Sequence, residues 1–252
     1  MRSFLSLIVV LGIALCGFQA CDTLQQAGIG GIPGTSLPAG QPSAVPTQTE
    51  IASGIKQALQ IGLENGVKQV SAVDGYFKNP LIKILFPPQA VKVENTLRSI
   101  GLGDLCDRVE LSLNRAAEDA AKQAGPIFGS ALKQMTLRDA TEILLGADTS
   151  ATAYFKRATT AELTRKFSPV IAKSLNQVGA TRYWSDVMTR YNQIPLVQPI
   201  NPDLTAYVTQ KAIEGLFVTV AQKEVQIRQQ LQARTTPLLK KVFGYAAQHP
   251  RQ

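Results

Sequence analysis

Pairs of polar residues at helical spacing are the part of this sequence best placed to do chemistry. In the segment SLNRAAEDAA, Asn114 and Glu118 are four residues apart, and so are Arg115 and Asp119. Residues four apart lie on one face of a helix. We group eight residues of this kind as the polar set: Asn114, Arg115, Glu118, Arg157, Tyr207, Gln210, Lys211 and Arg234. The polar set predicts a pocket among helices for an anionic or amide-bearing ligand, although such spacings are also typical of surface ion pairs and helix caps.

Acid–base catalysis in this chain would rest on carboxylates, because histidine is scarce. The one histidine is His249, in the C-terminal segment AAQHPRQ. Ser-His-Asp and Cys-His sites need a positioned imidazole, which a chain end does not provide. A hydrolase of envelope glycans could use Glu118 and Glu214 as general acid and base, since carboxylates in different environments can divide these roles. The sequence favours a non-enzymatic binding protein over this enzyme and predicts no catalytic residue of its own.

Cofactor, metal and nucleic-acid sites are not expected. The glycine-rich segment 28–34, GIGGIPG, has no strand before it and no GK[ST] after it, as a phosphate loop requires. Cys106 and His249 lack the spacing of zinc ligands, and we expect Cys106 to be a buried small hydrophobe. The positive charge is scattered and aromatic residues make up 6% of the chain, which disfavours nucleic acid as a partner.

Residues 1–20 have the pattern of a bacterial lipoprotein signal peptide. Arg2 precedes an apolar run, 5–15, that is too short to span a bilayer. Ala20 stands before Cys21, and a small residue before a cysteine favours lipidation of that cysteine. Phe18 departs from the usual pattern, so plain secretion and an uncleaved anchor stay open as alternatives.

Lipidation of Cys21 would tie the protein to a membrane on the periplasmic side of the cell envelope. Asp22 favours the inner membrane slightly over the outer one. Residues 21–47 are rich in glycine and proline and predict a flexible tether, with a reach of roughly 30 Å. The net charge of +8 favours anionic surfaces. The expected partners are therefore the membrane and an envelope protein, lipid or glycan. A carrier of a small ligand or lipid is a further alternative, and the oligomeric state stays open.

Residues 48–244 predict one all-α domain of about nine helices, followed by a polar tail, 245–252. The segment TQTE, 47–50, has the spacing of a capping box, and Thr136 with Asp139 has the pattern of a further N-terminal cap. Two expected helices, 149–158 and 160–178, would be separated by a cap at Thr159, and a short β-hairpin near 81–86 is the most sheet we expect. After the first cap comes an apolar stripe beside a line of small residues, where another helix should pack closely. The stripe consists of Ile51, Ile55, Leu59, Leu63, Val67 and Val70, and the small residues are Gly54, Ala58, Gly62 and Gly66.

Several blocks of this domain resemble, in order, the bacterial family called domain of unknown function 4197. They include GIKQALQIGLENGVKQVS, DGYFKNPLIKILFP, LRSIGLGDLCDRVELSLNRAAEDAA, ATAYFKRATTAEL, YVTQKAIEGLF and ARTTPLLKKVFG. The resemblance covers residues 51–244 and implies a helical, exported bacterial protein, often with a lipoprotein-like signal. It implies no reaction, so no catalytic positions are carried over.

Overall fold

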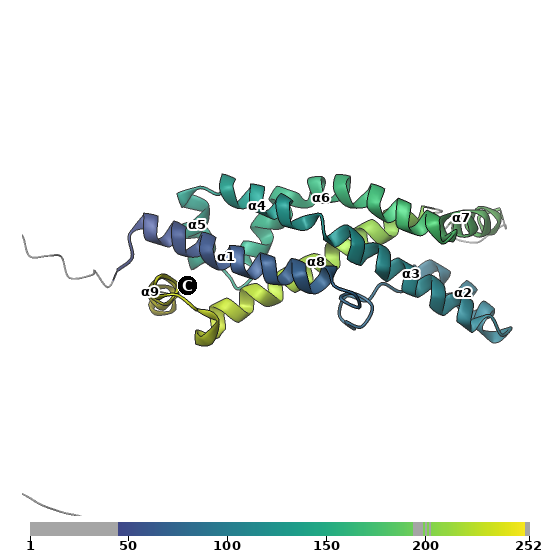
Figure 1. The fold of residues 1–252 in the computed structure, drawn as a ribbon, viewed down its shortest axis with the longest axis horizontal. Coiled ribbons are helices and arrows are strands. Elements are labelled where there is room, and N and C mark those ends of the chain that lie inside the picture. Colours follow the sequence, from purple (N-terminus) through teal and green to yellow (C-terminus); the bar gives the residue numbers. More distant parts are fainter. Residues whose placement is uncertain (1–44, 194–198, 200, 202, 250–252) are drawn as a thin grey trace, which may run out of the picture. The chain divides into compact units, whose positions relative to one another are not determined.

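Nine α-helices and two short 3-10 helices make up the regular structure of residues 45–193, 199, 201 and 203–249, which are the residues that the computed structural model describes. This part of the chain contains no strand, so the predicted all-α fold is confirmed (Figure 1). Cys21 and most of the expected tether lie outside the described residues. The elements are α1 (Gln48–Ser71), η1 (Pro88–Ala90), α2 (Val91–Ser99), α3 (Gly103–Ala121), α4 (Ala124–Gln134), α5 (Leu137–Leu145), α6 (Ser150–Gln177), α7 (Ala180–Tyr191), α8 (Leu204–Gln229), η2 (Leu231–Ala233) and α9 (Pro237–Gln248).

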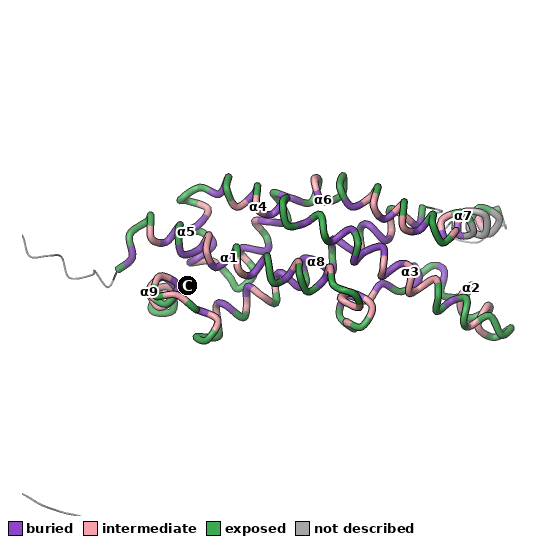
Figure 2. Tube along the Cα trace, viewed as in Figure 1, coloured by how far each residue is buried: buried purple, intermediate pink, exposed green. Residues whose placement is uncertain are grey.

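The long helices α1, α6 and α8 contribute nearly half of the buried hydrophobic residues of the core. Helix α8 packs against α6 and α1, while α3 and α4 cover further faces of α6. The buried faces of these helices turn toward one another (Figure 2). The ring of Phe128 on α4 lies 5.5 Å from that of Phe155 on α6 and 6.0 Å from that of Phe217 on α8. The described core runs from Ile51 to Phe243, so we expect a chain that begins at Asp22 to fold as a unit. Within the described ranges, no helix combines the length and hydropathy that a bilayer crossing requires.

Local capping signals in the sequence fold as predicted. Thr47 Oγ1 accepts a hydrogen bond from the N–H of Glu50 at 3.2 Å, and the Glu50 carboxylate accepts one from the N–H of Thr47 at 2.8 Å. Thr136 and Asp139 form the same reciprocal pair at the start of α5. Each pair satisfies backbone donors that the first helical turn leaves free.

The line of small residues on α1 confirms the expected close packing, but against two helices. A Cβ atom on Gly54 would lie 2.9 Å from Val242 Cγ2 of α9. One on Gly62 would lie 3.3 Å from Ile227 Cδ1 of α8. The small residues therefore let the first part of α1 pack closely against α9, and a later part of α1 pack closely against α8.

Two sequence expectations need correction, and the hairpin that was the most sheet expected is absent from the described residues. Helix α6 runs unbroken through Thr159, whose buried hydroxyl donates to the carbonyl oxygen of Phe155 at 2.6 Å and so stays within the helix. The segment 81–86 forms no hairpin, because the backbone N–H and C=O of Ile84 pair with the side chain of Asn114 on α3 and not with a second strand. Helix α9 continues to Gln248, four residues beyond the expected end of the helical domain at 244.

Candidate functional site

Asn114 is a buried residue of α3 that pairs with the extended segment before η1. Its Oδ1 accepts a hydrogen bond from the N–H of Ile84 at 2.8 Å, and its Nδ2 donates to the carbonyl oxygen of Ile84 at 2.8 Å. The side-chain amide therefore takes both backbone groups of Ile84, as a neighbouring strand would. Buried backbone groups need such partners, which explains why Ile84 is held here without a sheet.

Glu118 is also buried, and its carboxylate is fully engaged by structural partners. Oε1 accepts hydrogen bonds from the N–H groups of Tyr76 and Phe77 at 3.1 and 3.2 Å. Oε2 pairs with Arg115 Nη1 at 2.6 Å, and Arg115 Nη2 pairs with Asp74 at 2.6 Å. This network fixes the turn at 74–77 against α3. It argues against Glu118 as a general acid, because both carboxylate oxygens are paired within the protein and the side chain is buried.

Of the remaining members of the polar set, Tyr207 contacts the same segment and the others lie apart. The hydroxyl of Tyr207 donates to the carbonyl oxygen of Leu85 at 3.1 Å, which adds a third contact to the segment that Asn114 and Glu118 hold. Gln210 and Lys211 both donate to the half-exposed carboxylate of Glu214, at 2.8 and 2.7 Å.

Arg157 and Arg234 belong to other parts of the fold. The guanidinium of Arg157 lies 5.7 Å from the ring of Tyr154 on the exposed side of α6. Arg234 precedes α9 and is buried. The structure therefore does not gather all eight residues into one pocket. Four of them lie around the segment 74–86: Asn114, Arg115, Glu118 and Tyr207.

Glu224 and Arg228 on α8 form a second buried network, which the sequence analysis missed. Glu224 accepts hydrogen bonds from the N–H groups of Ala151 and Thr152, at 2.9 and 2.8 Å, so it caps the first turn of α6. Arg228 pairs with Glu224 at 3.0 Å and donates to the carbonyl oxygen of Ile143 at 2.6 Å. The Glu–Arg spacing of four residues would have indicated the pair. It would not have indicated the backbone groups that the pair binds on α5 and α6, which lie more than seventy positions earlier in the chain.

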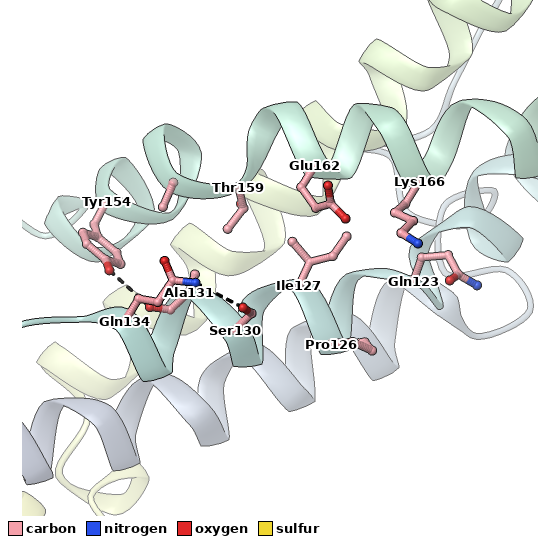
Figure 3. Close-up of a pocket in the computed structure, with 11 residues that line it drawn as sticks. Gln123, Pro126, Ile127, Ser130, Ala131, Gln134, Tyr154, Thr159, Glu162 and Lys166 are labelled. Carbon is pink, nitrogen blue, oxygen red and sulfur yellow. Dashed lines mark hydrogen bonds between the residues drawn. The ribbon is translucent and has the colours of Figure 1, made fainter.

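A groove between α4 and α6 is the candidate functional site, and we call it the α4–α6 groove. It has a volume of about 390 Å³. Figure 3 shows its side chains reaching from the two helices into the space between them. Its lining is Gln123, Pro126, Ile127, Ser130, Ala131 and Gln134 from the α4 side, with Tyr154, Ala158, Thr159, Glu162 and Lys166 from α6.

The walls of the α4–α6 groove carry amides, hydroxyls and one charge of each sign. Gln134 Nε2 donates to Ser130 Oγ at 3.3 Å, and the hydroxyl of Tyr154 donates to the carbonyl oxygen of Ala131 at 3.2 Å. The Arg165 guanidinium lowers the pKa of Glu162, so this carboxylate is ionised at neutral pH. These groups can form hydrogen bonds with a polar ligand. They do not form a nucleophile with an adjacent base, which covalent catalysis would need.

Comparison with known proteins matches the chain to a family model. The model of a family described as Protein of unknown function (DUF4197) matches residues 45–244. No curated protein and no solved structure matches the chain.

Proposed function

The chain belongs to the DUF4197 family, whose description names no activity, and we propose that it is a non-enzymatic binding domain tethered to a membrane of the cell envelope. The tether is supported by the sequence pattern at Ala20 and Cys21 and by the glycine- and proline-rich stretch 21–47. An acyl anchor on the periplasmic side would place the helical domain within roughly 30 Å of the membrane surface. The inner membrane is the more favoured site because of Asp22.

The α4–α6 groove is the observation that carries the binding role, and its chemistry favours an envelope glycan. From Tyr154 to Lys166, α6 extends for roughly 18 Å at the rise of an α-helix. Along this length the groove presents the amides of Gln123 and Gln134 and the hydroxyl of Ser130. A polymer that bears hydroxyl and amide groups along its length can pair with such a row of donors and acceptors.

A carboxylate-based hydrolase has less support than this binding role. Glu118 is held by two backbone N–H groups and by Arg115, while Glu214 is a half-exposed residue paired with Lys211. Neither residue lines the α4–α6 groove. A hydrolase would need two carboxylates that both face the bound sugar.

Sedimentation with insoluble cell-wall glycan tests the binding role. The chain from Asp22 to Gln252 should pellet with the glycan at roughly 0.15 M salt, where long-range charge attraction is largely screened. Ala158 is exposed and lines the groove, so Ala158→Trp should fill the groove without disturbing the core. Ala153 is another exposed alanine of α6 and lies outside the groove lining, so Ala153→Trp is the matched control.

We expect Ala153→Trp to bind as the original chain does and Ala158→Trp to bind at least about tenfold more weakly, a difference of roughly 1.4 kcal/mol. Equal binding by the two variants would contradict the assignment of the groove. Absence of binding by the original chain would contradict the glycan as its ligand.

A further inference from the structure

A second hollow lies between the end of α5, the end of α8 and α9, and we call it the Arg234 pocket. Its volume is about 410 Å³. One part of its lining is apolar and comes mainly from α5 and α9: Leu144, Leu145, Phe243, Ala246 and Ala247. Its charged or titratable side chains are Asp148, Arg228, Arg234 and His249. The pocket therefore combines an apolar wall with two arginine side chains, one carboxylate and one histidine.

Arg234 is the buried cation of this pocket, with 6% of its surface exposed. Its Nε donates to the carbonyl oxygen of Ile227 at 3.2 Å, and its Nη2 donates to that of Arg228. Its guanidinium lies 5.5 Å from the ring of Phe243. Within the part of the chain that the structure describes, Nη1 makes no hydrogen bond. One end of the guanidinium is thus held, and the other has donors available to a ligand.

The charge of Arg234 has no carboxylate partner among the described residues. The two carbonyl groups at the end of α8 are dipoles, which offset part of a positive charge without neutralising it. Burial lowers the pKa of Arg234, yet an arginine side chain stays protonated in proteins. A buried charge without a partner is costly, so an anion beside Arg234 would be stabilised there.

The other charged residues of the pocket are already engaged. Arg228 pairs with Glu224 at 3.0 Å. Asp148 accepts a hydrogen bond from Gln229 at 3.2 Å, and His249 Nδ1 lies 3.0 Å from the carbonyl oxygen of Tyr245. A ligand anion would therefore sit at Arg234, with its remaining atoms against the apolar wall.

We propose that the Arg234 pocket binds an anionic amphiphile, meaning a carboxylate or phosphate monoester attached to an apolar body. The head group would take the free donors of Arg234 in a charge-assisted hydrogen bond, and the body would cover Phe243 and Ala247. This site is separate from the α4–α6 groove. It gives the protein a small-ligand role whatever the groove binds.

Titration calorimetry of the chain from Asp22 to Gln252 with sodium octanoate tests this site. We expect saturable binding of one octanoate per chain. Octanol lacks the charge that would pair with Arg234, and inorganic phosphate lacks the apolar body that would cover the wall. Each should therefore bind at least about tenfold more weakly than octanoate. Octyl phosphate distinguishes the two head groups, and tighter binding than octanoate would assign the pocket to a phosphate monoester.

Two pairs of variants locate the binding. Ala247→Trp should fill the pocket and weaken octanoate binding at least about tenfold, whereas Gln248→Trp, on an exposed residue outside the lining, should leave it unchanged. Arg234→Met should reduce octanoate to the level of octanol, and Arg234→Lys should retain part of the preference. The Ala247 variant leaves the hydrogen bonds of Arg234 in place, so it decides the result if Arg234→Met unfolds. Equal binding of octanoate and octanol, or unchanged binding in Ala247→Trp, would overturn the proposal.

Discussion

Glu224 on α8 accepts two hydrogen bonds from Thr152 on α6, one from its backbone N–H and one from its hydroxyl, both at 2.8 Å. The two residues are 72 positions apart in the chain. Asp and Glu stabilise helix N-termini because the first N–H groups lack partners within the helix. Here the capping carboxylate comes from another helix, so capping α6 and packing α6 against α8 are one interaction.

Replacement of Glu224 should therefore be strongly destabilising. Glu224→Ala leaves Arg228 buried without its carboxylate and frees the N–H groups of Ala151 and Thr152. Breaking one side of a buried ion pair costs about 3–5 kcal/mol of unfolding free energy. Urea unfolding measures this loss.

Glu162→Ala is the matched control, because it breaks a surface pair with Arg165 on the exposed side of α6. Exposed pairs contribute at most about 1 kcal/mol. If the two variants lost similar stability, Glu224 would be an ordinary surface carboxylate.

Gly66 on α1 and Gly215 on α8 should respond to alanine in opposite directions. A Cβ on Gly215 would lie 2.7 Å from Tyr76 Cε1, and the Tyr76 ring cannot move freely because its hydroxyl donates to the carbonyl oxygen of Ala212 at 2.6 Å. Such overpacking costs about 1–3 kcal/mol. A Cβ on Gly66 would meet its nearest atom, Thr219 Cγ2, at 3.8 Å, an ordinary contact.

Gly66→Ala should consequently stabilise the protein by up to about 1 kcal/mol, the difference in helix propensity. Thermal unfolding of the two variants beside the original chain gives the comparison. A melting temperature that rises in Gly215→Ala, or falls in Gly66→Ala, would show that these helices pack differently.

The ion pairs of Asp74 should make the free energy of unfolding decrease as the pH falls into the acid range. Hydrogen bonds from Lys78, and then from Arg115, lower the pKa of Asp74 from its ordinary value of 3.8. Because the folded pKa is lowered, the stabilisation is fully present above the ordinary value and is lost as the pH falls through the lowered one. Asp74→Asn removes this effect, and asparagine tolerates the positive φ of 68° at this position.

Urea midpoints of the original chain and of Asp74→Asn, measured from about pH 6 to about pH 2, test this dependence. The advantage of the original chain should be greatest at the upper end of this range and should shrink below the ordinary pKa. A constant difference across the range would mean that Asp74 titrates alike in the folded and unfolded chain.

Sequence patterns predicted the structural features that depend only on residues close together in the chain. The caps at Thr47 and Thr136 require only a residue three positions later, and both are formed as expected. The line of glycines on α1 predicted close helix packing because only small side chains allow it. Thr159 shows the limit of such rules, since a hydroxyl that can cap a helix can also bond to the carbonyl group four residues before it and remain inside.

Sequence spacing did not reveal what the polar residues contact. Asn114 and Glu118 share a face of α3, as their spacing of four predicts, but the segment 74–86 covers that face and takes their hydrogen bonds. The partners are 30 and 42 positions away. A pattern within one helix cannot indicate which distant segment packs on it, so the same residues could be interpreted equally as a ligand pocket.

Mass spectrometry of the N-terminal peptide of the full-length protein, purified from bacterial membranes, tests the central claim most directly. The proposal predicts a chain that begins at Cys21 and carries acyl groups there. Cys21→Ser should abolish the modification, whereas Cys16→Ser should leave it unchanged because Cys16 is removed with the signal peptide. An unmodified N-terminus at another residue would contradict the lipid anchor and the tethered function built on it.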